Sequence, residues 1–342
     1  MAAAIQSTTI EPAIIQWLVD TRPLWPVPPQ SKPRDEVAQL KTVTTNNSFQ
    51  ASRALSLLTP TEQTSVLRYY HLKDAKMSLV SHLLKHLIIS KYAPISWANS
   101  TISRDVHGKP CFNPPLPSQP GMDFNVSHQA GIVSLIAVVG IGGRDKIEVG
   151  TDVVCWNERL THDYRSIEEE GFFKWVDIHA DVFAASEVSY MKLAPVDIDH
   201  APDGVIPNGF DKDKISRCQR RNEILKLGQE DGTIRISSNE IIDKKLRRFY
   251  ACWCLREAYI KMTGEALLAP WLKELEILDV KAPAVNERLE NVLMELIALG
   301  KGYMVGGAIR PAAKIEELQL KLGQWKHLDL EKDILAFSEL NS

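Results

Sequence analysis

One long, uninterrupted helix constrains the fold of this chain more than any other feature of its sequence. It lies between Ser237 and Gly264, a stretch that contains neither proline nor glycine. Ser237 with Glu240 three residues later has the pattern of a capping box, and Gly264 has the pattern of a glycine that ends a helix. The sequence therefore predicts a helix of about six turns.

One stripe of this predicted helix combines charged and apolar side chains. Spacings of three and four residues place five side chains on one side: Phe249, Trp253, Glu257, Ile260 and Lys261. A surface glutamate–lysine pair beside an amphipathic seam is the commonest meaning of such spacing. A charge on an apolar face, however, needs a partner, a metal ion or a catalytic task. Both interpretations stay open at this point.

Composition limits the class of protein. A chain of 342 residues can bury a substantial core, and two domains or lobes are expected. A formal net charge of -3 gives no electrostatic footprint for nucleic acid. No apolar run approaches the roughly 18 residues that span a bilayer, and the N-terminus lacks a secretory pattern. Five scattered cysteines support neither a disulfide framework nor a zinc site, so we expect a cytoplasmic protein without membrane or nucleic-acid partners.

The order of the predicted elements indicates two similar lobes. Apolar alternation and continuous apolar runs predict strands at Ala13–Val19, Met122–His128, Ile132–Val139, Glu148–Cys155, Leu275–Val280 and Gly302–Ile309. Helical periods predict helices at 61–91, Tyr164–His179, Phe183–Leu193, 237–264 and 285–299, with an exposed insertion at 195–236. We expect an α+β fold with an N-terminal lobe at 1–145 and a C-terminal lobe at 146–342.

A glycine-rich stretch, 140–143, follows a predicted strand without forming a dinucleotide-binding fingerprint. The third glycine of that fingerprint would be at position 145, which is Asp145, and a strand rather than a helix follows. These glycines are therefore predicted to form a hairpin turn or a short loop.

An aspartate within a predicted strand suggests a metal site. Asp152 is surrounded by strand-forming residues, where aspartate is rare. It could simply bond to backbone at a strand end. Alternatively, Asp152 and Glu257 meet and bind one divalent cation, since two carboxylates with water and phosphate oxygens suit Mg²⁺. Lys261, one turn beyond Glu257, would then lie beside the phosphates.

Basic and hydroxyl side chains elsewhere could bind a second phosphate. Ser127 and His128 are adjacent on a predicted strand and point to opposite faces, so they do not make a nucleophile and its base. As phosphate ligands at a strand end they are plausible, and Arg104 and Lys109 lie in a nearby basic loop. His128 could equally be a hydrogen-bonded structural histidine. The residues alone predict an Mg²⁺-dependent enzyme with a phosphate ligand.

Together these residues resemble the surfactin-type 4'-phosphopantetheinyl transferases. The family's motifs occur in order: Gly108-Lys109-Pro110 and then Phe124-Asn125-Val126-Ser127-His128-Gln129; Val149-Gly150-Thr151-Asp152; and Trp253, Arg256-Glu257-Ala258 and Lys261. The resemblance covers roughly residues 50–280. The run 258–276 is most similar to the broad-range enzymes of filamentous fungi.

The resemblance implies a pseudo-twofold monomer in which each lobe packs a small, mostly antiparallel sheet on a long helix. Coenzyme A would lie between the lobes, and its phosphopantetheine arm would pass to a carrier-protein serine with release of 3',5'-ADP. Asp152 and Glu257 would bind Mg²⁺, or Mn²⁺, on the pyrophosphate, and Glu257 would be the candidate base. Lys261 would stabilise the leaving group.

The same resemblance implies a set of nucleotide ligands. Arg104, Lys109, Ser127 and His128 would hold phosphates, with His128 at the 3'-phosphate, and Pro110 and Gln129 would line the nucleotide pocket. Further basic candidates come from a looser upstream motif: Arg53, Arg68, Lys73 and Lys76.

Two positions depart from the family pattern. Val154 stands where many bacterial members have a glutamate, so water or another side chain would complete the metal shell. Arg256 replaces the usual lysine before the catalytic glutamate and keeps its charge.

The leading hypothesis is an enzyme that modifies apo carrier domains of polyketide synthases, non-ribosomal peptide synthetases and aminoadipate reductase. The alternatives are a non-catalytic coenzyme A or nucleotide-binding protein on the same fold, and a scaffold protein that has no need of Mg²⁺.

Overall fold

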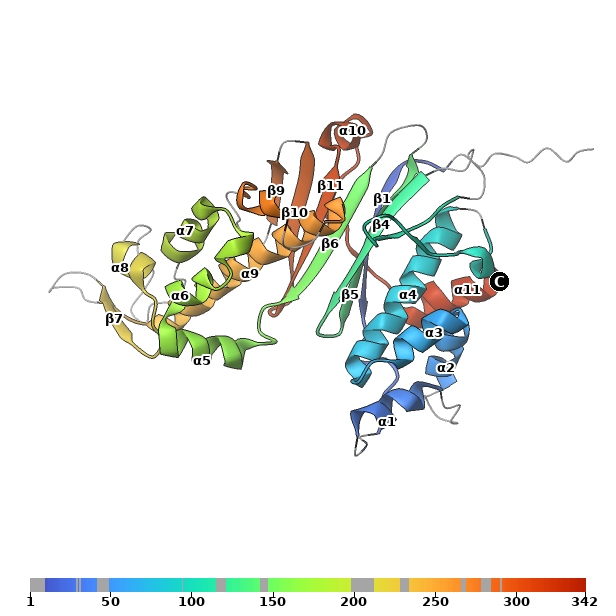
Figure 1. Cartoon of the computed structure of the whole chain (residues 1–342), viewed down its shortest axis with the longest axis horizontal. Coiled ribbons are helices and arrows are strands. Elements are labelled where there is room, and N and C mark those ends of the chain that lie inside the picture. The colour runs from blue at the N-terminus through green and yellow to red at the C-terminus, as the bar shows by residue number, and fades with distance from the viewer. Residues whose placement is uncertain are drawn as a thin grey trace, which may run out of the picture.

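Two four-stranded sheets, each covered by one long helix, form the framework of the molecule (Figure 1). The computed structural model describes residues 10–28, 30, 32–41, 49–93, 95–114, 121–141, 147–197, 212–227, 234–265, 269–277, 284–289 and 291–342. No helix within these ranges is both long and apolar enough to cross a bilayer. The arrangement is the expected α+β fold of two lobes.

The first lobe is built on a sheet with strand order β12-β1-β5-β4. Most pairs in it are antiparallel, and β12 pairs with β1 in parallel. Its elements before the crossover are β1 (Ala13–Asp20), α1 (Pro33–Ala38), η1 (Gln39–Lys41), α2 (Phe49–Ser56), α3 (Pro60–Leu67), α4 (Leu72–Tyr92), η2 (Trp97–Asn99), β2 (Ser103–Arg104), β3 (Pro110–Cys111), β4 (Gly121–Gln129) and β5 (Ile132–Ile141). The predicted strand at 13–19 and the hairpin of β4 and β5 are confirmed.

The second lobe is built on an antiparallel sheet with strand order β6-β11-β10-β9. Its elements are β6 (Glu148–Cys155), α5 (Leu160–Glu170), α6 (Phe172–Asp177), η3 (Ala180–Val182), α7 (Ala185–Leu193), α8 (Lys212–Arg217), β7 (Ile224–Leu227), β8 (Ile234–Ser237), α9 (Ser238–Thr263), η4 (Pro270–Lys273), β9 (Ala284–Leu289), β10 (Val292–Leu299), β11 (Tyr303–Arg310) and α10 (Ala312–Glu317). The strands predicted at 148–155 and 302–309 are confirmed as β6 and β11.

The long helix α9 has the predicted bounds. Ser237 is its N-cap, although the hydroxyl accepts from the amide of Asn239 rather than that of Glu240. Gly264 ends it in the left-handed region at φ 76°. Gly150 lets α9 approach β6 closely, because a Cβ there would lie 2.1 Å from the carbonyl oxygen of Ala258. This contact brings the stripe of Glu257 and Lys261 over β6.

The helix predicted at 285–299 is wrong. The segment forms the hairpin of β9 and β10, and Asn291 turns the chain at φ 65°. Met294 and Leu296 pack toward α9, whereas Leu293 and Ile297 belong to clusters between the lobes. Because both faces of β10 are covered, its sequence lacks the alternation that marks a half-exposed strand.

Other boundaries also differ from the sequence predictions. The helix predicted at 61–91 is two helices, α3 and α4, and Thr59 and Glu62 form a capping box on α3. The helical piece at 164–179 is divided at Gly171, which has φ 89°. The predicted insertion contains α8 and β7, and β7 pairs with β8. Leu275–Ile277 is not a strand, and 278–280, 142–143, 198–211 and 228–233 lie outside the described residues.

The C-terminal segment returns to the first lobe. It comprises β12 (Lys326–His327), which pairs with β1, η5 (Leu330–Leu335) and α11 (Ala336–Leu340). Helix α11 lies beside α3 and α4 (Figure 1). Leu330, Ile334 and Leu335 join the apolar core of that lobe. The first lobe therefore contains residues from both ends of the chain, whereas the sequence prediction assigned all of 146–342 to the second.

Candidate active site

Side chains of β4 connect the two sheets along their facing edges. Each of four alternate residues accepts a hydrogen bond from a backbone amide of β6, at the same sequence offset: Asp123 from Val149 (2.8 Å), Asn125 from Thr151 (3.1 Å), Ser127 from Val153 (3.4 Å) and Gln129 from Cys155 (3.0 Å). We call this set the interlobe ladder. Every second side chain of a strand points the same way, so four acceptors in a row satisfy the free edge of β6.

A lysine from the second lobe bonds to one rung of this ladder. Lys261 Nζ lies 2.5 Å from Asp152 Oδ1 and 2.9 Å from Ser127 Oγ. Ser127 Oγ in turn donates to Asp152 Oδ1 at 2.9 Å. These three residues, here the Lys261 triad, come from α9, β6 and β4, so the structure brings together three side chains that the sequence had singled out. An ammonium, a carboxylate and a hydroxyl group are therefore hydrogen-bonded to one another between the lobes.

Glu257 lies one helical turn before Lys261 and faces the same space. Its side chain is half-buried and makes no hydrogen bond to any described residue. Burial raises the pKa of Glu257, the negative charge of Asp152 raises it further, and Lys261 opposes the shift. A carboxylate that is left unbonded beside a second carboxylate can accept a proton or bind a cation.

The two carboxylates fit a magnesium ion. No cluster of three or more histidine, cysteine, aspartate or glutamate side chains with metal-ligand geometry occurs among the described residues. Mg²⁺ commonly binds one or two protein carboxylates and completes its shell with water and phosphate oxygens. Asp152 and Glu257 supply that number of ligands. Val154 is buried and packs in the core of the second lobe, so it contributes nothing to such a site.

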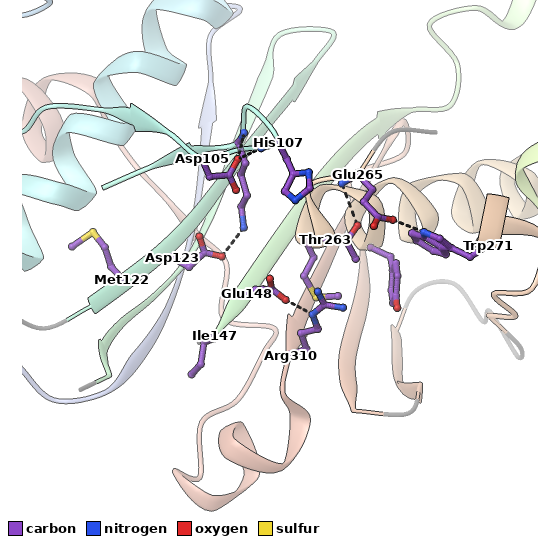
Figure 2. A pocket seen from close by; sticks show the side chains of 13 residues that line it. Asp105, His107, Met122, Asp123, Ile147, Glu148, Thr263, Glu265, Trp271 and Arg310 are labelled. Carbon is purple, nitrogen blue, oxygen red and sulfur yellow. Dashed lines mark hydrogen bonds and ion pairs between the residues drawn. The ribbon is translucent and has the colours of Figure 1, made fainter. Parts of the chain in front are cut away.

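The loop between β2 and β3 reaches across the end of the ladder toward α9. Lys109 Nζ donates to Asp123 Oδ2 at 2.6 Å and to the carbonyl of Val149 at 2.9 Å, so it connects both lobes. Pro110 begins β3 directly after it. Figure 2 shows His107 of the same loop beside Glu265, at the mouth of a cavity of about 550 Å³ between the lobes. Lys109 thus lines this cavity, although its ammonium already has two acceptors.

His128 lies near the end of β4 and Arg104 lies on β2, both in the first lobe. His128 is exposed, and desolvation by surrounding atoms and then the charge of Lys261 lower its pKa. Arg104 donates to the carbonyl of Gly108 at 2.6 Å. Gln129 closes the ladder and also donates to Glu158 at 2.9 Å.

The structure does not bring Arg53 and Lys76 to this group. Arg53 forms ion pairs with Glu331 and Glu339 of the returning C-terminal segment. Lys76 is buried on α4, and no charged group shifts its pKa, which burial alone lowers.

A pocket that sequence analysis did not predict lies along α9, one helical turn before Glu257. It has a volume of about 300 Å³, and we call it the aromatic pocket. Phe249 and Trp253 continue the stripe of Glu257 into it, and Trp175 packs edge-on against Phe249 with ring centroids 4.6 Å apart. The stripe was the only available signal, because Trp175 comes from α6, far away in the sequence.

Arg256 has a structural position rather than one in the cleft. Its side chain is 1% exposed and forms a buried ion pair with Glu187 of α7. It also donates to the carbonyl of Leu272 at 2.7 Å and to that of Leu275 at 2.7 Å. The guanidinium therefore fixes the helix turn that carries Glu257.

A lysine, two carboxylates and a hydroxyl gather between the two lobes, and such groups suit phosphoryl transfer, in which charge neutralisation and positioning perform most of the catalysis. Comparisons with known proteins identify the family. The model for the N-terminal part of the 4'-phosphopantetheinyl transferases matches residues 45–140.

Full-length similarity extends this match. The chain is 40% identical to 4'-phosphopantetheinyl transferase 1 of Fusarium mangiferae, with 96% of each chain covered. It is 31% identical to 4'-phosphopantetheinyl transferase NpgA of Emericella nidulans, over 98% of this chain and 96% of that one. It is 29% identical to the L-aminoadipate-semialdehyde dehydrogenase-phosphopantetheinyl transferase of Schizosaccharomyces pombe, over 41% of this chain and 48% of that one.

The chain belongs to the 4'-phosphopantetheinyl transferase family. It is an enzyme of that class: coenzyme A is its substrate, and carrier proteins are its acceptors.

Proposed function

We propose that the Lys261 triad and Glu257 form the centre at which the phosphopantetheine arm of coenzyme A passes to a carrier-protein serine. The main support is that Lys261, Asp152 and Ser127 hydrogen-bond to one another at the interlobe ladder. Glu257 lies one helical turn before Lys261 and makes no hydrogen bond to a described residue. The family of the chain fixes the reaction, and this geometry supports the assignment of residues.

The nucleotide half of coenzyme A lies along the first lobe. Lys109, Arg104, Ser127 and His128 bind its phosphates, and Pro110 and Gln129 line the nucleotide pocket. Support comes from Lys109, Ser127 and Gln129, whose side chains bond at the interlobe ladder. Arg53 and Lys76 are left out of this assignment, because Arg53 is paired with Glu331 and Glu339 and no described contact links Lys76 to the ladder.

Asp152 and Glu257 would hold the magnesium ion. When bound, Mg²⁺, or Mn²⁺ in its place, neutralises charge on the pyrophosphate of coenzyme A. The pair fits this ion because neither a third carboxylate nor a histidine is required for it.

Three residues of the chain have separate roles in the transfer step: Glu257, Lys261 and Ser127. Glu257 takes the proton of the carrier serine hydroxyl while the serine oxygen bonds to the phosphorus that bears pantetheine. The bond from that phosphorus to the bridging oxygen breaks, and 3',5'-ADP leaves. Lys261 stabilises the negative charge that develops on the leaving phosphate, an effect worth about 2.7–4 kcal/mol for a single well-placed donor. Ser127 positions the Lys261 ammonium through the hydrogen bond that it accepts from Nζ.

The aromatic pocket receives the pantetheine arm. It is lined by Phe249, Trp253 and Trp175, of which Trp253 lies one turn of α9 before Glu257, and its walls are largely apolar. A flexible, mostly uncharged arm that leaves the pyrophosphate toward α9 would find this surface first.

The acceptors are apo carrier domains of polyketide synthases, non-ribosomal peptide synthetases and aminoadipate reductase. The relative from Schizosaccharomyces pombe is named for an aminoadipate-semialdehyde dehydrogenase, which supports the last of these. We place the enzyme in the cytoplasm as a monomer, because all five cysteines are free thiols and one chain supplies both sides of the site.

Mass spectrometry of apo carrier proteins tests the proposal. Each carrier is incubated with the chain, coenzyme A and Mg²⁺, with a chelator in a parallel sample. We expect the carrier to gain the mass of one phosphopantetheine group with Mg²⁺ and none with the chelator. Transfer that is equally fast in the chelator would contradict the metal assignment, and coenzyme A binding without any mass gain would favour a non-catalytic binding protein.

A further inference from the structure

Glu257 depends on its helix for its position, because its own side chain makes no hydrogen bond to a described residue. A carboxylate that takes a proton or holds a metal ion must stay within about 0.5 Å of its productive place. The groups that fix this turn of α9 therefore influence what Glu257 can do. The residues on either side of it, Arg256 and Ala258, are both tightly held.

Ala258, the residue after Glu257, packs against the sheet of the second lobe. A Cβ on Gly150 of β6 would lie 2.1 Å from the carbonyl oxygen of Ala258, and a Cβ on Gly306 of β11 would lie 3.4 Å from the Ala258 Cβ. Glycines at both positions thus let the helix approach this closely. Because Ala258 offers only a methyl group, this contact sets the distance of α9 from the sheet, and longer side chains must set its rotation.

Arg256, the residue before Glu257, is bonded to three acceptors inside the second lobe. Its guanidinium forms an ion pair with Glu187 of α7, and each of the two residues is 1% exposed. Nη1 donates to the carbonyl of Leu272 at 2.7 Å, and Nη2 donates to that of Leu275 at 2.7 Å. Successive residues of a helix lie about 100° apart, so these bonds hold α9 in the rotation that directs Glu257 to the cleft.

Glu187 is itself fixed at both of its carboxylate oxygens. Oε2 accepts from the amide of Ala184 at 2.9 Å, and Oε1 accepts from the amide of Ile277 at 3.2 Å. Arg256 is therefore bonded to an acceptor that cannot rotate away. The ion pair joins three elements: α7, α9 and the segment after η4.

Stability alone is a weak reason for this buried pair. The attraction between two buried charges does little more than offset the cost of removing both from water, and an apolar pair of similar volume is often as stable. Arg256 Nε also has no acceptor within the described part of the chain, which adds to that cost. What the planar guanidinium does supply is a fixed geometry, because its donors point in set directions.

We propose that Glu187 is a positioning residue of the transfer reaction, which acts through its ion pair with Arg256 to hold Glu257 where it meets the carrier-protein serine. The inference rests on the proposed function, in which Glu257 takes the proton of that serine. Both members of the pair are buried in the second lobe, so neither contacts coenzyme A. Loss of the pair slows the transfer step and leaves coenzyme A binding unchanged.

Arg248 supplies a matched control, because it joins the other end of α7 to α9 without being next to Glu257. It donates to two carbonyls at the C-terminal end of α7, those of Ala194 at 2.5 Å and Pro195 at 2.6 Å. Arg248→Met and Arg256→Met each remove one arginine that connects the same two helices. A purely structural role would give both substitutions the same kind of effect.

Single-turnover transfer to an apo carrier protein tests the proposal in the wild type, Arg256→Met, Arg248→Met and the double variant Glu187→Gln/Arg256→Met. The double variant leaves neither charge of the pair without its partner, so it should melt close to the wild-type Tm even where Arg256→Met is unstable. We expect the rate constant at saturating coenzyme A to fall about 10- to 100-fold in Arg256→Met and in the double variant, with KM for coenzyme A nearly unchanged. Arg248→Met should keep the wild-type values of both.

A wild-type rate constant in the double variant would overturn the proposal, since the pair would then serve stability alone. An equal loss of rate in Arg248→Met would do the same, as would a rise in KM without a loss of rate. A lower amplitude with an unchanged rate constant would mean only that fewer molecules are folded, and it would also refute the positioning role. Absence of transfer by the wild type would instead contradict the proposed function.

Discussion

Lys245 and Lys261 both project from α9, but their surroundings give them different tasks. Lys261 reaches Asp152 and Ser127 at the cleft. Lys245 is fully buried and donates to three carbonyls, of Lys192 (2.8 Å), Ser216 (2.6 Å) and Cys218 (2.8 Å). Its ammonium therefore connects α7 and the C-terminal end of α8 to α9. No counter-charge is bonded to it, so burial lowers the pKa of Lys245 to about 8 from 10.5.

This shift predicts how stability depends on pH. Between about pH 8 and pH 10.5 the unfolded chain keeps a proton on Lys245 that the folded chain has lost, so the free energy of unfolding rises with pH in that window. Relative to Lys245→Met, the wild type should gain roughly 1–3 kcal/mol there and nothing below pH 8. Urea unfolding of both proteins at several pH values between 7 and 10.5 measures this gain. A constant difference across the range would contradict it.

At the scale of elements, β4 and β6 meet through side chains instead of a backbone ladder. Asn125 is 5% exposed, and its side-chain oxygen satisfies the buried amide of Thr151. The neighbouring rung is Ser127, which also bonds to Lys261. The interlobe ladder thus fixes the register between the lobes at the place where the site is assembled.

Removing one rung should cost stability. Asn125→Leu keeps the approximate volume but leaves the amide of Thr151 buried without an acceptor, which should lower the free energy of unfolding by about 1–3 kcal/mol. Asn99→Leu, at an exposed asparagine of the first lobe, is the control and should change it by less than about 0.5 kcal/mol. If both variants unfold at the wild-type urea concentration, the ladder does not hold the lobes together.

At the scale of the whole molecule, the two ends of the chain share one lobe. β12 pairs with β1, and Leu335 is 0% exposed in the core of the first lobe. Between the lobes, Glu295 of β10 bonds to Gln16 of β1 and accepts from Trp325 Nε1 at 2.8 Å. The cleft is therefore held by contacts on both sides of the ladder, and the C-terminal segment is part of the scaffold.

Leu335→Ala tests this role of the C-terminal segment. A cavity in the core should lower the free energy of unfolding by about 2–5 kcal/mol, as for other buried leucines. Leu340→Ala changes the same residue type in the same segment, but Leu340 is 86% exposed, so its effect should stay below about 0.5 kcal/mol. Similar small effects of both substitutions, measured by urea unfolding, would show that the segment is not part of the core.

Local patterns predicted those parts of the fold and site that depend on neighbouring residues. Capping, period and the ending glycine located α9, and the alternation in 122–128 located β4. The strand β10 could not be recognised because contacts from distant elements cover both of its faces.

The central claim is that Glu257 acts at the interlobe site, and one measurement tests it most directly. Single-turnover transfer to an apo carrier protein, followed by mass spectrometry, compares the wild type with Glu257→Gln and with Glu240→Gln, a substitution in the first turn of the same helix. Loss of the base should slow Glu257→Gln by about 100- to 10,000-fold with an unchanged circular dichroism spectrum, while Glu240→Gln keeps the wild-type rate. A wild-type rate for Glu257→Gln would contradict the account.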